Sequence, residues 1–382
     1  MSETIKQLAV RTALELGAGA VRVTTARADE ESRRRMQAAF ARRDFLCWSY
    51  DDDYARRAND PTELCSGARS VICIALPYAT AAPRGGALRG RVSNYAWSAD
   101  YHRRLRSLLD AVAHAIDQAA GERVTTVACD TRPLAERALA ARAGLGWVGK
   151  HTSLISPGLG SFVFLGEVVT TLELPPDQSL AKSCGSCARC VEACPTAALR
   201  GDYTIDANRC ISDLTQRTDA IPITMRPLIG DWVWGCDLCQ LVCPPTRDAG
   251  PLGGAQWAPL DQEAGRPALV DLLRLRSGTF RRRFEQTAMG WRGAAVLRRN
   301  AAVALGNALD RSTVGPLAES LCADPHPMVR GHAAWALGRI GSPAALEALR
   351  GRSAVEPSDE VRAEISMALQ PFHSPRGVCS TR

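Results

Sequence analysis

The chain has 382 residues, of which 46% are hydrophobic and 23% charged, with a formal net charge of +7 at pH 7. This length suffices for two or three domains with real cores. The start, MSETIKQLAV, lacks the features of a signal peptide, and no stretch approaches the roughly 20 apolar residues of a membrane span. We therefore expect a cytoplasmic globular protein with no membrane partner. The small positive charge permits an acidic or nucleic-acid partner and is weak support for one.

Strand-like and helix-like patterns alternate in the first part of the chain. β-Branched runs of strand length occupy 69–78, 123–130 and 161–174. Between the first two runs, apolar residues recur at helical spacing from Leu105 to Ile116. The pattern predicts an α/β or α+β domain.

A glycine motif, GLGWVG at 144–149, matches the dinucleotide fingerprint G-x-G-x-x-G. A true fingerprint follows a strand and opens a helix, whereas this one follows the helical pattern PLAERALAARA. We therefore expect Gly144 to end a helix, and no dinucleotide site here.

Cysteine spacing is the strongest signal in the chain, which has 14 cysteines. The run CGSCARCVEACP has the bacterial ferredoxin pattern C-x2-C-x2-C-x3-C-P, and CDLCQLVCP repeats it without the first cysteine, which Cys210 can replace. Two [4Fe-4S] clusters follow from the crossed ligation of such motifs. One would be held by Cys184, Cys187, Cys190 and Cys243, and the other by Cys194, Cys210, Cys236 and Cys239.

A pair of structural zinc sites is the alternative to these clusters, since zinc held by four cysteines also uses C-x2-C pairs. Zinc sites do not usually need a triple run followed by proline in both halves, so clusters are favoured. Most of the other cysteines, which show no ligand spacing, are expected to be ordinary small apolar residues.

Downstream of the cysteines the chain becomes helical and repeats itself. Similar helical segments start at Leu297, Val329 and Val361, 32 residues apart each time, with Arg298, Arg330 and Arg362 in register. An apolar helix that cannot bury its face alone stacks on its neighbours, which predicts a short HEAT-like α-solenoid. For the repeated arginines we favour contacts inside the solenoid over contacts with a ligand.

An arginine-rich stretch lies before and inside the first repeat. Guanidinium groups pair with phosphates and aromatic rings stack on exposed bases, so this stretch is the best nucleic-acid footprint in the chain, with a solvated helix face as the equal alternative. Its members are Arg281, Arg282, Arg283, Arg292, Arg298 and Arg299, with Phe284 and Trp291 between them.

This order of parts resembles the epoxyqueuosine reductase family over nearly the whole chain. The segments that carry the resemblance are RVSNYAWSADYHRRL, VACDTRPLAERALAARAGLGWVGKHTSLISPGLGSFVFLGEV, CISDLTQR and RPLIGDWVWGCDLCQLVCP. The resemblance implies an α+β multidomain fold. Its parts would be an α/β cobalamin-binding catalytic domain at 1–175, a ferredoxin-like domain with two [4Fe-4S] clusters at 176–250, HEAT-like repeats at 266–372 and a tail at 373–382.

The resemblance also implies an activity. Enzymes of the family reduce the epoxide of epoxyqueuosine to the cyclopentene of queuosine at the tRNA wobble position, the last step of queuosine biosynthesis. Cobalamin is their reactive cofactor and the two clusters supply its electrons. The implied partners are tRNA and an electron donor such as a flavodoxin or ferredoxin, and we expect a monomer.

Site residues are carried over by position. Asp130, in VACDTRP, would be the proton donor, although by itself an aspartate between a strand and Pro133 is typical of a helix cap. The role requires a protonated carboxyl when substrate is bound, and we expect burial against the corrin to raise its pKa. Lys150 and His151 are expected near the site. The corrin would be lined by Arg57, Ser93, Asp130, Leu165, Ser212, Cys236 and Asp237.

Two other functions fit parts of the pattern. Another corrinoid iron-sulfur reductase, such as a reductive dehalogenase, shares the cofactors but would not need the repeats. A ferredoxin-type electron carrier fused to a solenoid scaffold would bind no corrin. The chain lacks a D-x-H-x-x-G motif, and the nearest text, at Asp324 to Val329, falls in a repeat loop, so we expect no axial histidine from the protein.

Overall fold

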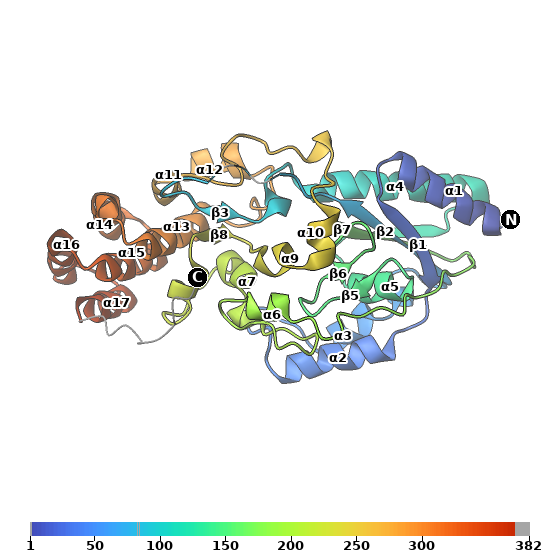
Figure 1. Ribbon diagram of the computed structural model, residues 1–382, viewed down its shortest axis with the longest axis horizontal. Helices are drawn as coiled ribbons and strands as arrows, with labels where there is room; N and C mark the ends of the chain where they lie inside the picture. The colour runs from blue at the N-terminus through green and yellow to red at the C-terminus, as the bar shows by residue number, and fades with distance from the viewer. Residues whose placement is uncertain (1, 82, 84, 371–382) are drawn as a thin grey trace. The chain divides into compact units, whose positions relative to one another are not determined.

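The computed structural model describes residues 2–81, 83 and 85–370 (Figure 1). The expected tail at 373–382 lies outside the described residues, as do the last two residues of the expected repeat domain. The chain forms two compact units, each built from separate stretches of sequence. The first comprises Met1–Ala82, Ser93–Asp213 and Cys236–Ala264, and the second Pro83–Val92, Leu214–Gly235 and Gly265–Arg382. In the described ranges, no helix is long and apolar enough to cross a membrane.

A four-stranded antiparallel sheet forms the centre of the first unit. Its strand order is β1 (Ala20–Thr25), β2 (Ser70–Pro77), β7 (Val163–Thr170) and β4 (Thr125–Ala128). The three runs expected to be strands are confirmed, whereas β1 was not expected. All of β2 except its last residue is buried, because both faces of the sheet are covered.

Helices cover this sheet on both faces. On one face, α1 (Ser2–Glu15) and α4 (Tyr101–Ala120) pack with the strands around Leu105, Leu109 and Ile116. On the other face, α5 (Glu136–Arg142) packs through Leu139 and Ala140. The apolar residues at helical spacing in α4 are therefore the ones on its buried face, as the sequence predicts. The helices α2 (Glu30–Ala41) and α3 (Asp52–Ala58) complete the N-terminal part, with η1 (Pro61–Glu63) after them.

Short elements carry the glycine motif and the cysteines. The hairpin strands β5 (Trp147–Val148) and β6 (Leu154–Ile155) follow α5. Gly144 follows α5 with φ +81°, as expected of a helix-ending glycine, and a Cβ there would lie 2.0 Å from the carbonyl oxygen of Gln178. Short helices then make up the cysteine region, namely α6 (Arg189–Glu192), η3 (Ala207–Arg209), α7 (Ile211–Gln216), α9 (Leu238–Leu241) and α10 (Pro244–Ala249). Elsewhere in the chain, η2 (Asn94–Ala96) precedes α4, and η4 (Ala255–Trp257) follows α10.

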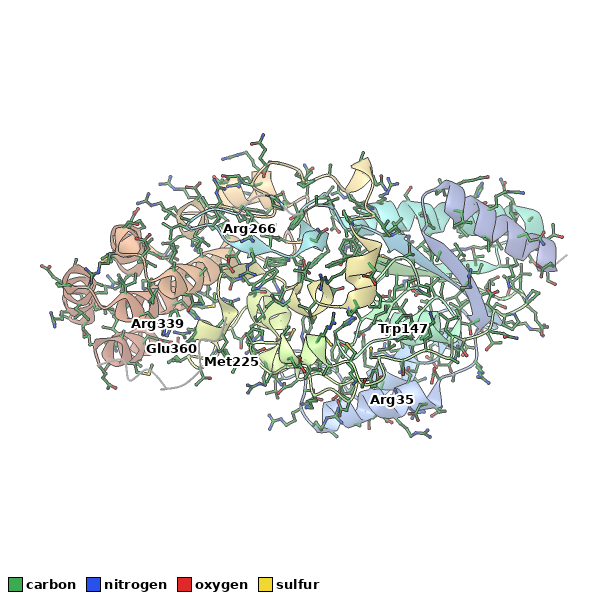
Figure 2. All side chains as sticks on the ribbon, viewed as in Figure 1. Arg35, Trp147, Met225, Arg266, Arg339 and Glu360 are labelled. Atoms are coloured by element: carbon green, nitrogen blue, oxygen red, sulfur yellow. The ribbon has the colours of Figure 1, made fainter. Side chains whose placement is uncertain are left out.

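The second unit is a helical solenoid joined to a small parallel strand pair. The strand pair is β3 (Arg91–Val92) with β8 (Trp232–Trp234). The helices are α8 (Arg226–Ile229), α11 (Leu269–Leu273), α12 (Ser277–Phe284), α13 (Ala294–Ala308), η5 (Arg311–Thr313), α14 (Val314–Ala323), α15 (Pro327–Ile340), α16 (Pro343–Ser353) and α17 (Asp359–Leu369). Figure 2 labels Arg339 on α15 and Glu360 on α17.

The sequence repeat corresponds to the stacking of α13, α15 and α17. A Cβ on Gly306 would lie 2.7 Å from the Trp335 ring, and one on Gly338 would lie 2.7 Å from Cβ of Ala368. Glycine therefore recurs in the first two repeats because it allows the next helix to approach closely. The predicted α-solenoid is confirmed.

The repeated arginines bind inside the solenoid. Arg298 pairs with Asp324 at 2.6 Å, and Arg330 pairs with Glu356 at 2.6 Å. Arg362 donates a hydrogen bond to the backbone carbonyl oxygen of Glu356. These contacts confirm the favoured interpretation, in which the arginines make their contacts inside the solenoid.

Candidate active site

Asp130 follows β4 directly and adopts a left-handed backbone conformation, with φ +53°. This conformation is uncommon for a residue other than glycine, and such residues cluster at functional sites. Asp130 does not cap a helix, because α5 has Ala135 at its N-cap position. The interpretation of Asp130 as a helix cap is therefore wrong.

The Asp130 carboxylate is held by two residues from the first turn of α4. Tyr101 donates a hydrogen bond of 2.6 Å from its hydroxyl to Oδ2 of Asp130. His102 Nε2 lies 3.4 Å from the same oxygen, and its Nδ1 lies 2.7 Å from Oδ1 of Asp100. The imidazole therefore stands between two carboxylates, and the Asp130 side chain remains 60% exposed.

These contacts set the protonation states. The contact with His102, followed by the hydrogen bond from Tyr101, keeps the pKa of Asp130 below its ordinary value despite partial burial. The rise in pKa expected for Asp130 buried against the corrin stays a prediction. The two carboxylates raise the pKa of His102 to about 9, with Asp100 contributing most. At neutral pH the proton of this group consequently resides on the imidazole.

Aromatic rings lie around Asp130 and His102. Tyr101 stacks on Phe164 with ring centroids 4.1 Å apart. Burial, followed by the charge of Tyr54, raises the pKa of Tyr50 to about 12, and Asp130 also contributes. Tyr50 and Tyr54 lie 4.5 Å apart between ring centroids, and the charge of Asp130 acts on both. Asp130 thus presents an exposed carboxylate from within an aromatic environment.

The residues expected at the corrin are partly brought together. Ser93 donates a hydrogen bond of 2.5 Å to Oδ1 of Asp237, and the backbone N–H of Asn94 donates to Oδ2 at 2.8 Å. Burial raises the pKa of Asp237 to about 6. Cys236, beside Asp237 in sequence, also belongs to the first unit.

Three other expected corrin residues have separate positions. Arg57 lies on α3 and pairs through Nε with Oδ2 of Asp53 at 2.8 Å. Leu165 lies on β7 opposite Ala75 of β2. Ser212 lies in α7. The proposed corrin site therefore does not depend on a contact between these side chains and the Ser93–Asp237 pair.

The segment between β5 and β6 contains a buried, neutral histidine. His151 Nδ1 accepts a hydrogen bond from the backbone N–H of Ser153 at 3.2 Å, so the ring proton is on Nε2. Burial lowers the pKa of His151 to about 4. Among the described residues, Nε2 has no hydrogen-bond partner.

This segment also contacts the cysteine region. Lys150 Nζ donates a hydrogen bond of 2.9 Å to the carbonyl oxygen of Gly185. Lys182 Nζ lies 5.6 Å from the ring centroid of Trp147, which Figure 2 labels. Both contacts tie the segment to the chain around the first cysteine run.

The cysteines of the first run lie near those of the second. Burial raises the pKa of Cys190, and Cys184 and Cys243 add to the rise through their charges. Burial also raises the pKa of Cys243, and the charges of Cys184 and Cys187 add to this rise. These neighbours are the four residues expected at the first cluster.

The cysteines expected at the second cluster also lie near one another. Burial raises the pKa of Cys236 and of Cys239, and the charge of Cys210 adds to both rises. Burial raises the pKa of Cys210 to about 11, and Cys194 is among its neighbours. The backbone N–H of Ala198 donates to Sγ of Cys194 at 3.3 Å, the kind of contact that tunes a cluster. Because burial disfavours thiolates, iron would be needed to hold them ionised. Within the described ranges, no three Cys, His, Asp or Glu side chains form a site for a single metal ion.

The arginine-rich stretch divides into exposed and buried members. Arg281 and Arg282 are exposed at the end of α12. Arg283 lies 5.2 Å from the Phe284 ring. Arg292 lies 3.6 Å from the ring centroid of Trp291, which is 53% exposed.

Two of the predicted tRNA contacts are wrong. Arg299 is 0% exposed and donates to the carbonyl oxygens of Leu214, Arg217 and Asp219. Arg298 is committed to its ion pair with Asp324. Neither guanidinium is free to bind a phosphate, because each already satisfies buried partners within the second unit.

Three family profiles match the chain. One described as epoxyqueuosine reductase QueG, DUF1730, matches residues 57–131. A 4Fe-4S double cluster binding domain matches 183–246, and HEAT repeats match 293–370. The chain therefore carries the double-cluster domain that the cysteine spacing predicts, and the zinc alternative is set aside.

Known proteins resemble the chain over most of its length. Epoxyqueuosine reductase of Bacillus anthracis is 37% identical over 84% of this chain and 85% of its own length. A crystal structure of epoxyqueuosine reductase with an epoxyqueuosine-modified tRNA-Tyr stem loop has a TM-score of 0.90 and 32% identity, covering 97% of this chain and 99% of that one. A structure from Bacillus subtilis, with the same TM-score, identity and coverage, has its catalytic aspartate loop swung out of the active site.

The fold and the site define an iron-sulfur oxidoreductase with a mixed α/β part, a double-cluster domain and HEAT repeats. By the extent of its identity with these relatives, the chain belongs to the epoxyqueuosine reductase family.

Proposed function

We propose that this protein reduces epoxyqueuosine to queuosine at the wobble position of tRNA, using cobalamin and two [4Fe-4S] clusters. One observation carries the proposal: Asp130 is presented on a strained loop, held by Tyr101 and next to a protonated His102. This loop belongs to the same compact unit as the eight expected cluster ligands. In the family, a relative has been crystallised with the epoxyqueuosine-modified stem loop.

The reaction needs two electrons and two protons. The epoxide loses its oxygen as water, and its two carbons become joined by a double bond. Each cluster passes one electron at a time, so the eight cysteines serve to hold two one-electron carriers. Cobalamin, when bound, supplies the low-valent metal chemistry that opens the ring.

The residues of this chain supply the first of the two protons to the epoxide oxygen, and solvent supplies the second as that oxygen leaves as water. His102 is charged at neutral pH and lies 3.4 Å from Oδ2 of Asp130, so a proton can pass from the imidazole to the carboxylate. Asp130 then gives this proton to the oxygen of the opening epoxide. Asp130 has a low pKa and can nevertheless act as the donor, because the neighbouring His102 holds the proton until it is transferred.

For the corrin we propose the residues carried over from the family. Ser93 and Asp237 form a buried polar pair beside Cys236, and Leu165 adds an apolar side chain. His151 Nε2, buried and unpartnered among the described groups, is a donor suited to a polar group of such a ligand. Arg57 and Ser212 complete the proposed set.

For tRNA we propose the exposed members of the arginine-rich stretch. Arg281 and Arg282 offer charge for phosphates, and Trp291 offers a ring for stacking. Arg283 and Arg292 remain part of this proposed surface. We further propose that the protein acts as a cytoplasmic monomer and that a flavodoxin or ferredoxin reduces its clusters.

An anaerobic assay tests this function. The reconstituted protein, cobalamin, a chemical reductant and epoxyqueuosine-containing tRNA are combined, and the nucleosides are analysed by mass. We expect conversion to queuosine, and Asp130→Asn should abolish it while leaving cluster and corrin absorbance unchanged. Corrin binding without conversion would point to another substrate. Absence of corrin binding would leave an electron-transfer scaffold.

A further inference from the structure

The Asp130 loop has a backbone anchor as well as its side-chain contacts. The N–H of Asp130 donates a hydrogen bond of 2.6 Å to Oε1 of Glu136, at the start of α5. A residue at φ +53° needs such contacts, because the left-handed region is unfavourable for an aspartate by itself. Glu136 therefore fixes the backbone, whereas Tyr101 and His102 fix the carboxylate.

A second glutamate lies in the sheet behind this loop. Glu167 is on β7 opposite Ala128, the last residue of β4 and two residues before Asp130. It is 0% exposed, and within the described part of the chain neither carboxylate oxygen has a hydrogen-bond partner. An ionised carboxylate in such a place would be very costly, so Glu167 is held uncharged.

The two glutamates act on each other. Burial raises the pKa of both, and the charge of Glu136 is the largest further contribution at Glu167. Two carboxyl groups in this relation do not both ionise readily. The titratable and charged groups that face the pair from neighbouring elements are Tyr54, Cys73, His102, Cys129, Asp130, Arg137 and Arg142.

We propose that Glu136, with Glu167 behind it, is a proton-responsive positioning unit for Asp130. An ionised Glu136 holds the Asp130 N–H with a charge-assisted hydrogen bond and keeps the loop in place. Protonation of Glu136 weakens this bond and loosens the loop. Glu167 stays uncharged behind it, so the proton response belongs to Glu136. The inference adds to the proposed function, since it assigns how the proposed proton donor is positioned.

Amide hydrogen exchange of the cobalamin-loaded protein tests the anchor without any assay of activity. In Glu136→Ala, the peptide covering 129–135 should lose protection by roughly ten- to a hundredfold, as expected when a hydrogen bond to a charged group is removed. Glu136→Gln keeps an acceptor oxygen but not its charge, so it should restore only part of the protection. The matched control is Glu122→Gln, which changes an exposed glutamate of the same unit.

The pH dependence tests the proton response. In the wild type, protection of this peptide, after correction for intrinsic exchange, should rise with pH as Glu136 ionises, and Glu136→Gln should remove this dependence. Glu167→Gln mimics the uncharged side chain that is already present, so its midpoint should equal that of the wild type. A shifted midpoint would overturn the part assigned to Glu167, and unchanged protection in Glu136→Ala would overturn the whole inference.

Turnover gives an independent readout that separates this inference from the proposed function. Glu136→Ala should lower kcat more than tenfold while leaving KM for the tRNA unchanged, and Glu136→Gln, which keeps the acceptor without its charge, should recover part of the rate. An unchanged kcat would contradict the positioning role. Failure of the wild type to convert epoxyqueuosine would refute the proposed function, whereas the exchange measurements would still decide the role of Glu136.

Discussion

The hydroxyl of Tyr101 donates a 2.6 Å hydrogen bond to Oδ2 of Asp130 and joins residues 29 apart in sequence. It brings the first turn of α4 to the loop after β4. The phenol thereby orients the carboxylate and favours its charged form.

Replacement of this phenol should change both rate and pH dependence. In Tyr101→Phe, we expect kcat/KM to fall roughly tenfold, because orientation of the donor is lost. The pKa of Asp130 should rise when the hydrogen bond is removed, so the coupled Asp130–His102 pair should keep its proton to higher pH, and the alkaline limb of the pH-rate profile should move with it. A pH series of single turnovers checks this, and an unaltered profile would show that Tyr101 does not act on Asp130.

Loss of one cluster ligand should remove one cluster. Cys187→Ser takes a thiolate from the first expected set, so bound iron should fall from about eight to about four atoms per chain if the second cluster persists. Iron analysis and electron paramagnetic resonance of the reduced protein measure this. Cys322→Ser, which changes an exposed free cysteine of the repeats, is the control. Full iron content in Cys187→Ser would exclude this residue as a ligand.

The ion pair between Arg330 and Glu356 should stabilise the repeats. Glu356 has a side chain that is 0% exposed, so Glu356→Gln should cost about 3 kcal/mol of unfolding free energy at neutral pH, since Arg330 is left without its charge partner. Denaturant unfolding measures this. Asp359→Asn, at an exposed ion pair with Arg362, is the control and should have little effect. Equal stability of the two variants would contradict the assignment.

This pair should also make stability depend on pH. Burial by itself would raise the pKa of Glu356, but hydrogen bonds from Arg330 and the backbone of Ser358 lower it from 4.5 to about 2. A lowered carboxyl pKa stabilises the fold above pH 4.5, and this contribution is lost as the pH falls towards 2. Glu356→Gln should therefore unfold with a weaker pH dependence in this range than the wild type.

Charge reversal at the end of α12 should weaken tRNA binding. The double variant Arg281→Glu, Arg282→Glu should bind tRNA at least tenfold more weakly at low salt and show a shallower dependence of affinity on salt. Its unfolding free energy should not change, since both side chains are exposed. Arg311→Glu changes another exposed arginine of this unit and serves as the control. An equal loss in both proteins would indicate nonspecific charge.

Much of this architecture could be predicted because its signals are local. Cluster ligands occur at fixed short spacings, since a short loop must wrap a cube, and the spacing from Cys184 to Cys194 therefore indicates the centre directly. The three recurring helices could be recognised because stacked repeats need the same apolar face each time. The first strand, β1, was missed, although it pairs along β2 from Ala20 to Thr25.

Single side chains could not be assigned in this way. From the sequence, Arg299 looks like its neighbours in a basic stretch, yet carbonyl oxygens more than 80 residues earlier in the chain surround it. The lowered pKa of Asp130 likewise depends on a residue distant in sequence, because the side-chain contact that lowers it most is with His102 on α4. Local sequence spacing indicates neither the carbonyl oxygens around Arg299 nor the His102 side chain beside Asp130.

The sequence by itself therefore determined the family, the double-cluster segment, the repeats and the position of Asp130, since these depend on residue types at short spacings. Only the tertiary structure decided which charges face one another. It placed His102 between two carboxylates, buried Arg299 and set Glu136 and Glu167 behind the Asp130 loop. The physical reason is that burial and charge act through space, between residues that the chain brings together only when it folds.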